Sequence, residues 1–439
     1  MKFDKYFELA KERGIEPFEL KFVSNSKLSI NLYQQEVEQY TSAQDHSITG
    51  RGIYEGKLGS FSTGMVNSST PALMIDQILK NAKYGIQGHP EFFIEGGQKY
   101  TRIRNFHKDL KSVNPSRLIE LGKSLAKKIQ EKDSRIEVVS TSIELHESVE
   151  QFENSKGLKL KDHSNYLIVS SGVQARNNQE VVSQDNYAFI TDLSDFDEDK
   201  FVDELVLKTV KQFNGEKIQS GKYDVVLNNE SAAVLIDVLS SQLSAYAVEH
   251  HLSLFEGKEG QKVLSNKLTV TDKPLAKTIF DHAYDDEGTP CSNHTLIEKG
   301  VLKTYIYDLE TAKKFNKQTT GNGHQSGSKI VPSTNLLEVK KGRLSFEEVL
   351  KRVNNGIYIT SLAGIGTGIN PTSGDYSLQA SGYYIADGKL STPIPLMTIA
   401  GNLLTDFNKI KDIASDSKLT IEGVLTPSIS LRKLSISGE

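Results

Sequence analysis

Residues 223–248 read YDVVLNNESAAVLIDVLSSQLSAYAV, and this stretch decides the architecture of the second half of the chain. Its first five residues predict a short buried strand. Asn228 and the polar residues after it offer N-cap side chains for a helix that continues to about Val248. Apolar residues recur along that helix at helical spacing and leave a polar face that contains Asp237. The sequence therefore predicts a domain that is opened by a strand and a long helix.

The residues on either side of this stretch predict an α+β protein of two domains. The first domain, at 1–215, mixes helices with alternating strands that suit a curled antiparallel sheet. A polar, glycine-containing segment at 214–222 links it to the second. The second domain, at 222–439, is predicted to be mostly β, with short strands between glycine turns and one helix at 346–353. Helices of the first domain are expected at 3–13, 71–84, 115–131 and 198–213.

Composition excludes several classes of function. The 439 residues carry 56 acidic and 52 basic side chains, a formal net charge of −4, and these charges are interspersed. A nucleic-acid-binding surface is therefore not expected. The single cysteine, Cys291, cannot form an internal disulfide. The N-terminus has no long apolar run and no apolar stretch is long enough to cross a bilayer, so we expect a cytoplasmic protein without a membrane partner.

Common catalytic motifs are absent from the sequence. It contains no H-E-x-x-H, no C-x-x-C, no Walker loop and no G-x-S-x-G. His250 and His251 form the densest group of potential metal ligands. Adjacent residues of a helix point about 100° apart, so these two do not readily share one ion. Solvent-facing or hydrogen-bonded histidines are the simpler interpretation.

Two other polar elements are candidates for a binding cleft. Asp285, Asp286 and Glu287 place three carboxylates just before a turn, where they could hold a hard cation, act as acid or base, or accept backbone N–H groups. Without a histidine nearby, we favour the structural role. The second element, at 320–323, lets the backbone approach another strand or a peptide ligand closely. Its residues are Thr320, Gly321, Asn322 and Gly323.

Six short stretches occur in an order that matches a known family. They are FD at 280–281, DDEGTP at 285–290, LIEKGVLKTY at 296–305, TGNG at 320–323, PTSGDYS at 371–377 and IAGNL at 399–403. Together they resemble the TldD/PmbA family of metallopeptidase-related proteins, which includes members labelled modulators of DNA gyrase. The resemblance covers nearly the whole chain and is strongest from Tyr223 onward.

The resemblance implies that this chain lacks a metal site of its own. TldD-type members bind zinc through H-E-x-x-x-H on the helix that opens the second domain and through a cysteine near the C-terminus. The other branch, TldE or PmbA, lacks these ligands. Here the two histidine positions fall on Ile236 and Ser241, and the glutamate position falls on Asp237. The stretch at 421–427 has no cysteine, so the chain resembles the TldE/PmbA branch, and zinc is expected only in a TldD-type partner.

The function implied is that of a non-catalytic subunit, inactive alone, that pairs with a TldD-type chain in a dimer to degrade or trim unfolded peptides. A homodimer is the other assembly expected. Extended peptides would bind through main-chain hydrogen bonds, with the elements at 285–287 and 320–323 as candidate cleft residues. Two alternatives stay open. One is an autonomous metallopeptidase with a relocated site at His250, His251 or the acidic cluster, and the other is a regulatory protein that acts on DNA gyrase.

Overall fold

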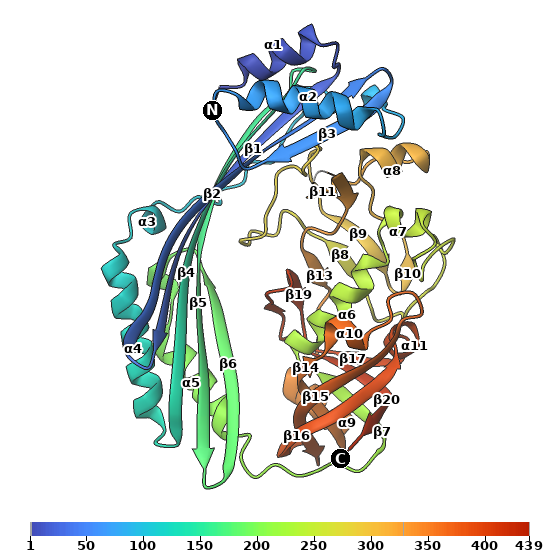
Figure 1. Cartoon of the computed structure of the whole chain (residues 1–439). Helices are drawn as coiled ribbons and strands as arrows, with labels where there is room; N and C mark the ends of the chain where they lie inside the picture. The colour runs from blue at the N-terminus through green and yellow to red at the C-terminus, as the bar shows by residue number, and fades with distance from the viewer. Residues whose placement is uncertain (1, 328, 439) are drawn as a thin grey trace. The chain divides into compact units, whose positions relative to one another are not determined.

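The computed structural model describes residues 2–327 and 329–438 and divides into two compact units. The first unit comprises Met1–Phe213 with two segments from later in the sequence, Ala283–Pro290 and Gly323–Ile330. The second unit comprises the rest of the chain from Asn214 onward. Figure 1 shows the helices and strands of both units along the chain. Mixed α and β structure in each unit confirms the predicted α+β class.

A curled, fully antiparallel sheet organises the first unit, as the sequence predicted. Its strand order is β3-β2-β1-β4-β5-β6. Four strands are unusually long, and β1 pairs with β2 and β4 over almost its whole length. The pairing of β1 with β2 steps from Asn31 with Gln39 to Leu32 with Val37, so Glu38 is an extra, bulged residue of β2. The strands are β1 (Phe18–Tyr33), β2 (Glu36–Tyr54), β3 (Lys57–Thr63), β4 (Ile136–Asn154), β5 (Lys159–Asn177) and β6 (Glu180–Ile190).

Helices cover one face of this sheet in two separate places, each with its own apolar core. Phe18 and Leu20 of β1 join the core under α1 and α2, whereas Ile30 and Leu32 join the core under α4 and α5. Strand side chains alternate between faces, so all four lie on one face and Glu19 lies on the other. The helical elements are α1 (Asp4–Glu12), α2 (Thr70–Ala82), η1 (Pro90–Phe92), α3 (Lys108–Lys111), α4 (Pro115–Lys132), η2 (Leu193–Asp195) and α5 (Glu198–Val210).

Five strands of the second unit close into a β-barrel. Their order is β16-β15-β14-β7-β20, and a pairing of β16 with β20 completes the ring. The pairing of β14 with β7 is parallel, and the other four are antiparallel. The other half of β20 also pairs with β17. The strands are β7 (Gly221–Leu227), β14 (Gly356–Ala363), β15 (Asp375–Ala386), β16 (Lys389–Asn402), β17 (Ile410–Ile413) and β20 (Ile429–Ser437).

A second sheet of short strands, ordered β10-β9-β8-β13-β19-β18, and a β11-β12 pair complete the β structure. The strands are β8 (Val270–Asp272), β9 (His294–Glu298), β10 (Val301–Leu302), β11 (Gly323–Ser326), β12 (Lys329–Pro332), β13 (Leu337–Val339), β18 (Lys418–Leu419) and β19 (Val424–Thr426). The helices are α6 (Asn229–Ser241), α7 (Ala245–Glu249), α8 (Leu309–Lys314), α9 (Phe346–Val353), α10 (Ile365–Gly368) and α11 (Leu403–Phe407). In the described residues no helix is both long and apolar enough to span a membrane.

The helix predicted to continue to Val248 is shorter, because the chain breaks it into α6 and α7. Its start is as predicted, since Asn228 Oδ1 accepts a hydrogen bond from the Ser231 N–H at 2.7 Å. At the break, the Ala245 N–H donates to the Ile306 carbonyl and the Ile306 N–H donates to the Leu243 carbonyl. Backbone groups used in this bridge cannot continue a helical ladder.

Candidate functional site

The positions that replace the zinc motif lie on α6 in the second unit, and their side chains serve different purposes. Ile236 is 2% exposed and belongs to the main apolar core of the unit. Asp237 and Ser241 are exposed. Ser241 Oγ donates to the Val238 carbonyl at 2.8 Å within the helix. Residues five apart on a helix point about 140° apart, which agrees with one buried and one exposed position.

A second carboxylate, Glu422, influences Asp237 and comes from the stretch where the resemblance would place a cysteine. Partial desolvation, together with the negative charge of Glu422, raises the pKa of Asp237. Glu422 Oε2 is buried and has no hydrogen-bond partner among the described residues. The charges of Asp237 and Glu422 therefore oppose each other at this position.

These donors do not fit a catalytic zinc ion. Zinc in proteins takes histidine nitrogen, cysteine sulfur or carboxylate oxygen, and a catalytic site has three protein ligands. Ile236 has no donor atom, and the Ser241 hydroxyl is a poor neutral ligand. Of the three positions that replace the motif, Asp237 alone carries a strong donor, its carboxylate. Across residues 2–327 and 329–438, no group of three His, Cys, Asp or Glu side chains is arranged to hold a metal ion.

The two adjacent histidines each engage a neighbour on their own segment. His250 Nδ1 lies 2.9 Å from the Tyr246 carbonyl, and its ring stacks on the Tyr246 ring at 4.0 Å. His251 Nδ1 lies 2.8 Å from a carboxylate oxygen of Glu256. Both imidazoles are exposed. Their partners are local, and the two rings do not converge on one point.

Asp285 begins the acidic cluster of the first unit, and its carboxylate is held by backbone groups. Oδ1 accepts from the N–H groups of Glu287 at 3.0 Å and Thr289 at 2.9 Å, and Oδ2 accepts from the Gly323 N–H at 2.8 Å. Burial raises the pKa of Asp285 to about 7, against the lowering effect of these three donors. The carboxylate thus closes its own turn and fastens that turn to β11.

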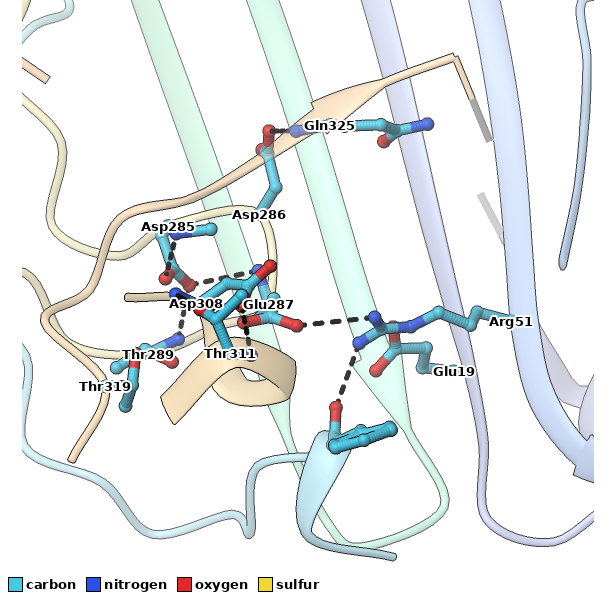
Figure 2. A network of polar contacts seen from close by, with 12 residues as sticks. Glu19, Arg51, Asp285, Asp286, Glu287, Thr289, Asp308, Thr311, Thr319 and Gln325 are labelled. Atoms are coloured by element: carbon cyan, nitrogen blue, oxygen red, sulfur yellow. Dashed lines mark hydrogen bonds and ion pairs between the residues drawn. The ribbon is translucent and has the colours of Figure 1, made fainter. Parts of the chain in front are cut away.

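Asp286 continues the cluster toward the sheet, as Figure 2 shows beside Gln325. Its carboxylate forms an ion pair with Lys21 and accepts from the Gln325 N–H at 2.6 Å. Lys21 Nζ also lies 2.8 Å from Glu150 of β4. Burial acts to raise the pKa of Asp286, but Lys21 and the backbone donor outweigh it, so that pKa is lowered. Lys21 therefore clamps the 285–287 turn onto the face of the sheet that the helices leave uncovered.

Arg51 makes a second clamp beside the first. Its Nη1 lies 3.3 Å from Glu287, its Nε 2.6 Å from Glu19, and its Nη2 donates to the Phe92 carbonyl at 2.9 Å. In Figure 2 the guanidinium points toward Glu287, and Glu19 is drawn next to it. Gly323 is required next to this pair, because a Cβ there would lie 2.8 Å from Glu287 Oε2.

The candidate element at 320–323 is divided between the two units. Gly323 belongs to the first, where it contacts the acidic cluster, and the three residues before it belong to the second. Thr320 Oγ1 accepts from the Tyr307 N–H at 2.8 Å. The Gly321 carbonyl accepts from the Cys291 thiol at 3.3 Å. Asn322 is fully buried and donates to Asp272 at 2.6 Å. These polar groups are used within the protein, which leaves their role in a cleft a prediction.

Sequence reasoning missed the basic residues that organise the acidic cluster. Lys21 and Arg51 lie more than 200 residues from their acidic partners, with separations of 265 and 236. Alternation along β1 places Glu19 and Lys21 on one face, but it does not identify a partner so distant in sequence. Glu422 was missed because a glutamate in a turn is ordinarily solvated.

Comparison with known proteins decides the family. A profile of the PmbA/TldA metallopeptidase C-terminal domain matches residues 220–438, and a profile of the central domain matches residues 108–213. The chain belongs to the PmbA/TldD family. The metalloprotease PmbA of Escherichia coli O157:H7 is 26% identical over 330 residues, 74% of this chain and 71% of that protein. A PmbA homolog of Haemophilus influenzae is 24% identical over 98% of this chain and 94% of its own length.

Solved structures of PmbA/TldD-like proteins share the whole fold. A Thermotoga maritima crystal structure, named as a proposed modulator of a DNA gyrase, is 26% identical, covers 99% of both chains and has a TM-score of 0.91. TldE from Thermococcus kodakarensis has a TM-score of 0.90 at 21% identity, over 99% of this chain and 100% of its own. The chain is therefore a metallopeptidase-like protein whose α6 position carries no zinc ligand set.

Proposed function

We propose that this chain is the non-catalytic subunit of a two-chain peptidase. Its partner is a TldD-type chain that carries H-E-x-x-x-H and the zinc ion, and the pair trims unfolded peptides. This chain supplies part of the peptide-binding surface and no metal. Asp285, Asp286, Glu287 and the 320–323 element remain its candidate cleft residues.

The observation that carries the proposal is the absence of metal-binding side chains at the motif's histidine positions on α6. Ile236 occupies a histidine position of the motif and is packed into the core of the second unit. A core leucine- or isoleucine-sized side chain contributes to stability by burial and offers no lone pair. Hydrolysis by a zinc-activated water requires an ion held by three ligands with one open position. The chemistry must therefore reside in another chain if proteins of this pair hydrolyse peptides.

Extended peptides are the substrate class that suits such a pair. An unfolded chain presents backbone N–H and C=O groups at every residue, and a strand-like mode of binding uses these groups whatever the side chains. Weak sequence selectivity follows from that mode.

Reconstitution tests the proposal directly. The purified chain is mixed with a TldD-type chain from the same genome, and cleavage of an unstructured fluorogenic peptide is followed while zinc is measured by elemental analysis. We expect cleavage by the mixture at least ten times faster than by either chain alone, and one zinc per pair. Cleavage should disappear when a histidine of the partner's motif is replaced by alanine.

Two results would overturn the proposal. One is peptide cleavage by this chain alone that a chelator abolishes, which would require a relocated metal site. The other is a mixture no more active than the TldD-type chain by itself. Asp237→Asn in this chain is the matched internal control, because it alters the α6 position without touching the partner's zinc.

A further inference from the structure

One end of the β-barrel in the second unit carries a cavity of about 510 Å³. The parallel strands β7 and β14 begin at this end, and β15, which is antiparallel to β14, finishes there. Small-molecule sites often lie in the mouths of β-barrels, and cavities of roughly 300 to 1,000 Å³ accommodate such ligands. Every lining residue belongs to the second unit. The lining includes Glu216, Lys222, Tyr223, Asp224, Tyr384 and Lys433.

Two β-bulges shape this end of the barrel. On β20, Arg432 and Lys433 together oppose the single residue Asp224 of β7. On β16, residues 391–392 together oppose Tyr384 of β15. Lys433 has a φ of 55°, a left-handed conformation that is uncommon for a residue with a side chain. Bulges occur at barrel rims and beside binding sites, where they re-aim side chains, and Lys433 of this bulge lines the cavity.

Three charged side chains of the cavity have no partner of opposite charge. Within residues 2–327 and 329–438, Lys222, Lys433 and Glu216 take part in no ion pair, and all three are exposed. Asp224 differs, because its carboxylate lies 3.8 Å from Lys411 Nζ and accepts from the Lys433 N–H at 3.3 Å. The cavity therefore offers two positive charges and one negative charge to a ligand.

The two lysines are placed to act on one anionic group. Lys222 of β7 pairs with Ser435 of β20. Lys433 is therefore a diagonal neighbour of Lys222, and such neighbours lie about 7 to 8 Å apart on paired strands. Both side chains line the same cavity. An anionic group bound between them is attracted by both charges.

Glu216 reaches the cavity from another part of its rim. Its N–H donates to the carbonyl of Pro393 in β16 at 2.9 Å. Burial, followed by Tyr223 and the negative charge of Glu216, raises the pKa of Tyr384. A negative charge therefore stands beside the two tyrosines that line the cavity.

We propose that this end of the barrel binds a small zwitterion, a short peptide with a free carboxylate and a free ammonium group. Lys222 and Lys433 bind the carboxylate, Glu216 binds the ammonium group, and the uncharged middle of the peptide lies against Tyr223 and Tyr384. A zwitterion matches both signs of unpaired charge, whereas a simple anion leaves Glu216 facing a like charge. Neither α6 nor the 285–287 turn takes part, so the site is independent of any pairing with a TldD-type chain.

Calorimetric titration of the full-length chain with trialanine, uncapped at both ends, tests the ligand class. We expect one saturable site per chain with a dissociation constant below about 1 mM. Conversion of the carboxylate to an amide should weaken binding at least about tenfold, because both lysines lose their anionic partner. Acetylation of the amine should weaken it at least about threefold, because one exposed charge contact is lost.

Two results of this titration would overturn the inference. One is the absence of saturable binding at millimolar trialanine, or equal binding of the uncapped and capped peptides. The other is tighter binding of inorganic phosphate than of trialanine, which would make the cavity a site for simple anions.

Substitutions in the cavity test which side chains hold the two ends. Lys222→Gln and Lys433→Gln should each raise the dissociation constant of trialanine at least about fivefold, and Glu216→Gln should bind the uncapped and acetylated peptides equally. Lys340→Gln is the matched control, because Lys340 is an exposed lysine of the same unit outside the cavity. It should leave the dissociation constant unchanged. An equal loss in Lys340→Gln would assign the effect to net charge and overturn the site.

Discussion

The acidic cluster of the first unit and the α6 position of the second unit both gather carboxylates, but they treat them in opposite ways. In the cluster, Lys21 and Arg51 are each placed between two carboxylates. At α6, partial burial and the negative charge of Glu422 raise the pKa of Asp237, and Glu422 Oε2 has no hydrogen-bond partner in the described residues. Buried carboxylates with matched cations hold distant chain segments together, whereas the charges of Asp237 and Glu422 oppose each other.

Of the changes considered, replacement of Lys21 should cause the largest loss of stability, because it removes the cation that the acidic cluster depends on. Lys21→Met leaves Glu150 and Asp286 facing each other in a largely enclosed site, and the loss of one partner of a buried ion pair is expected to cost about 3 to 4 kcal/mol of unfolding free energy. Lys27→Met is the matched control on the same strand, because Lys27 is 44% exposed in its pair with Glu144. That control should lose less than about 1 kcal/mol. Urea unfolding of both variants measures the difference, and equal losses would contradict the clamp.

Shortening side chains on the buried and the exposed face of α6 should have different effects on stability. Ile236→Ala removes three buried carbons from the core of the second unit and should cost about 2 to 3 kcal/mol. Ser241→Ala, at the other histidine position, is exposed and should change stability by less than about 0.5 kcal/mol. Thermal or urea unfolding provides the comparison. A small effect of Ile236→Ala would mean that this position is not the core residue described above.

The pH dependence of stability should report on Asp285. Its folded pKa, about 7, lies above the ordinary value for aspartate, so the native state binds a proton that the unfolded state releases. Stability from this group is therefore fully present below about pH 4 and is lost as the pH rises through about 7. Asp285→Asn should remove that decline between pH 5 and pH 8. It should also cost about 1 to 2 kcal/mol at pH 5, because its amide cannot accept from all three backbone donors.

The measurement is a series of urea unfolding curves at several pH values for both proteins. Thr289→Ser is a suitable control, because it keeps the backbone N–H that donates to Asp285. An unaltered slope in Asp285→Asn would show that the neighbouring carboxylates, and not Asp285, dominate the proton uptake.

Relief of repulsion at α6 should give the smallest effect. Asp237→Asn removes the charge that faces Glu422, and we expect a gain in stability of less than about 1 kcal/mol at pH 7 because solvent screens an exposed residue. The gain should shrink in 1 M salt. A loss of stability would instead indicate that Asp237 is paired in the folded protein.

The sequence predicted correctly those helix ends that are determined by neighbouring side chains. The helix predicted at 346–353 is α9, because the Ser345 hydroxyl and the Glu348 carboxylate form a capping box at its start. For the helix that Asn228 caps, the predicted start was correct, but the predicted end, near Val248, lies beyond the observed end at Ser241. Its end is set by the bridge between Leu243, Ala245 and Ile306, and no residue near Ser241 announces a backbone contact with a segment 60 residues away.

The candidate site divides in the same way. The sequence alone determined that position 236 has no donor atom and that position 241 has only a hydroxyl, because the identity of a side chain fixes which ligands it can offer. Only the tertiary structure decided that Ile236 belongs to a core and that Lys21 and Arg51 meet the 285–287 turn. Those contacts depend on sheet register and on which face of β1 the turn covers, and these follow from burial summed over the whole unit, not from any local pattern.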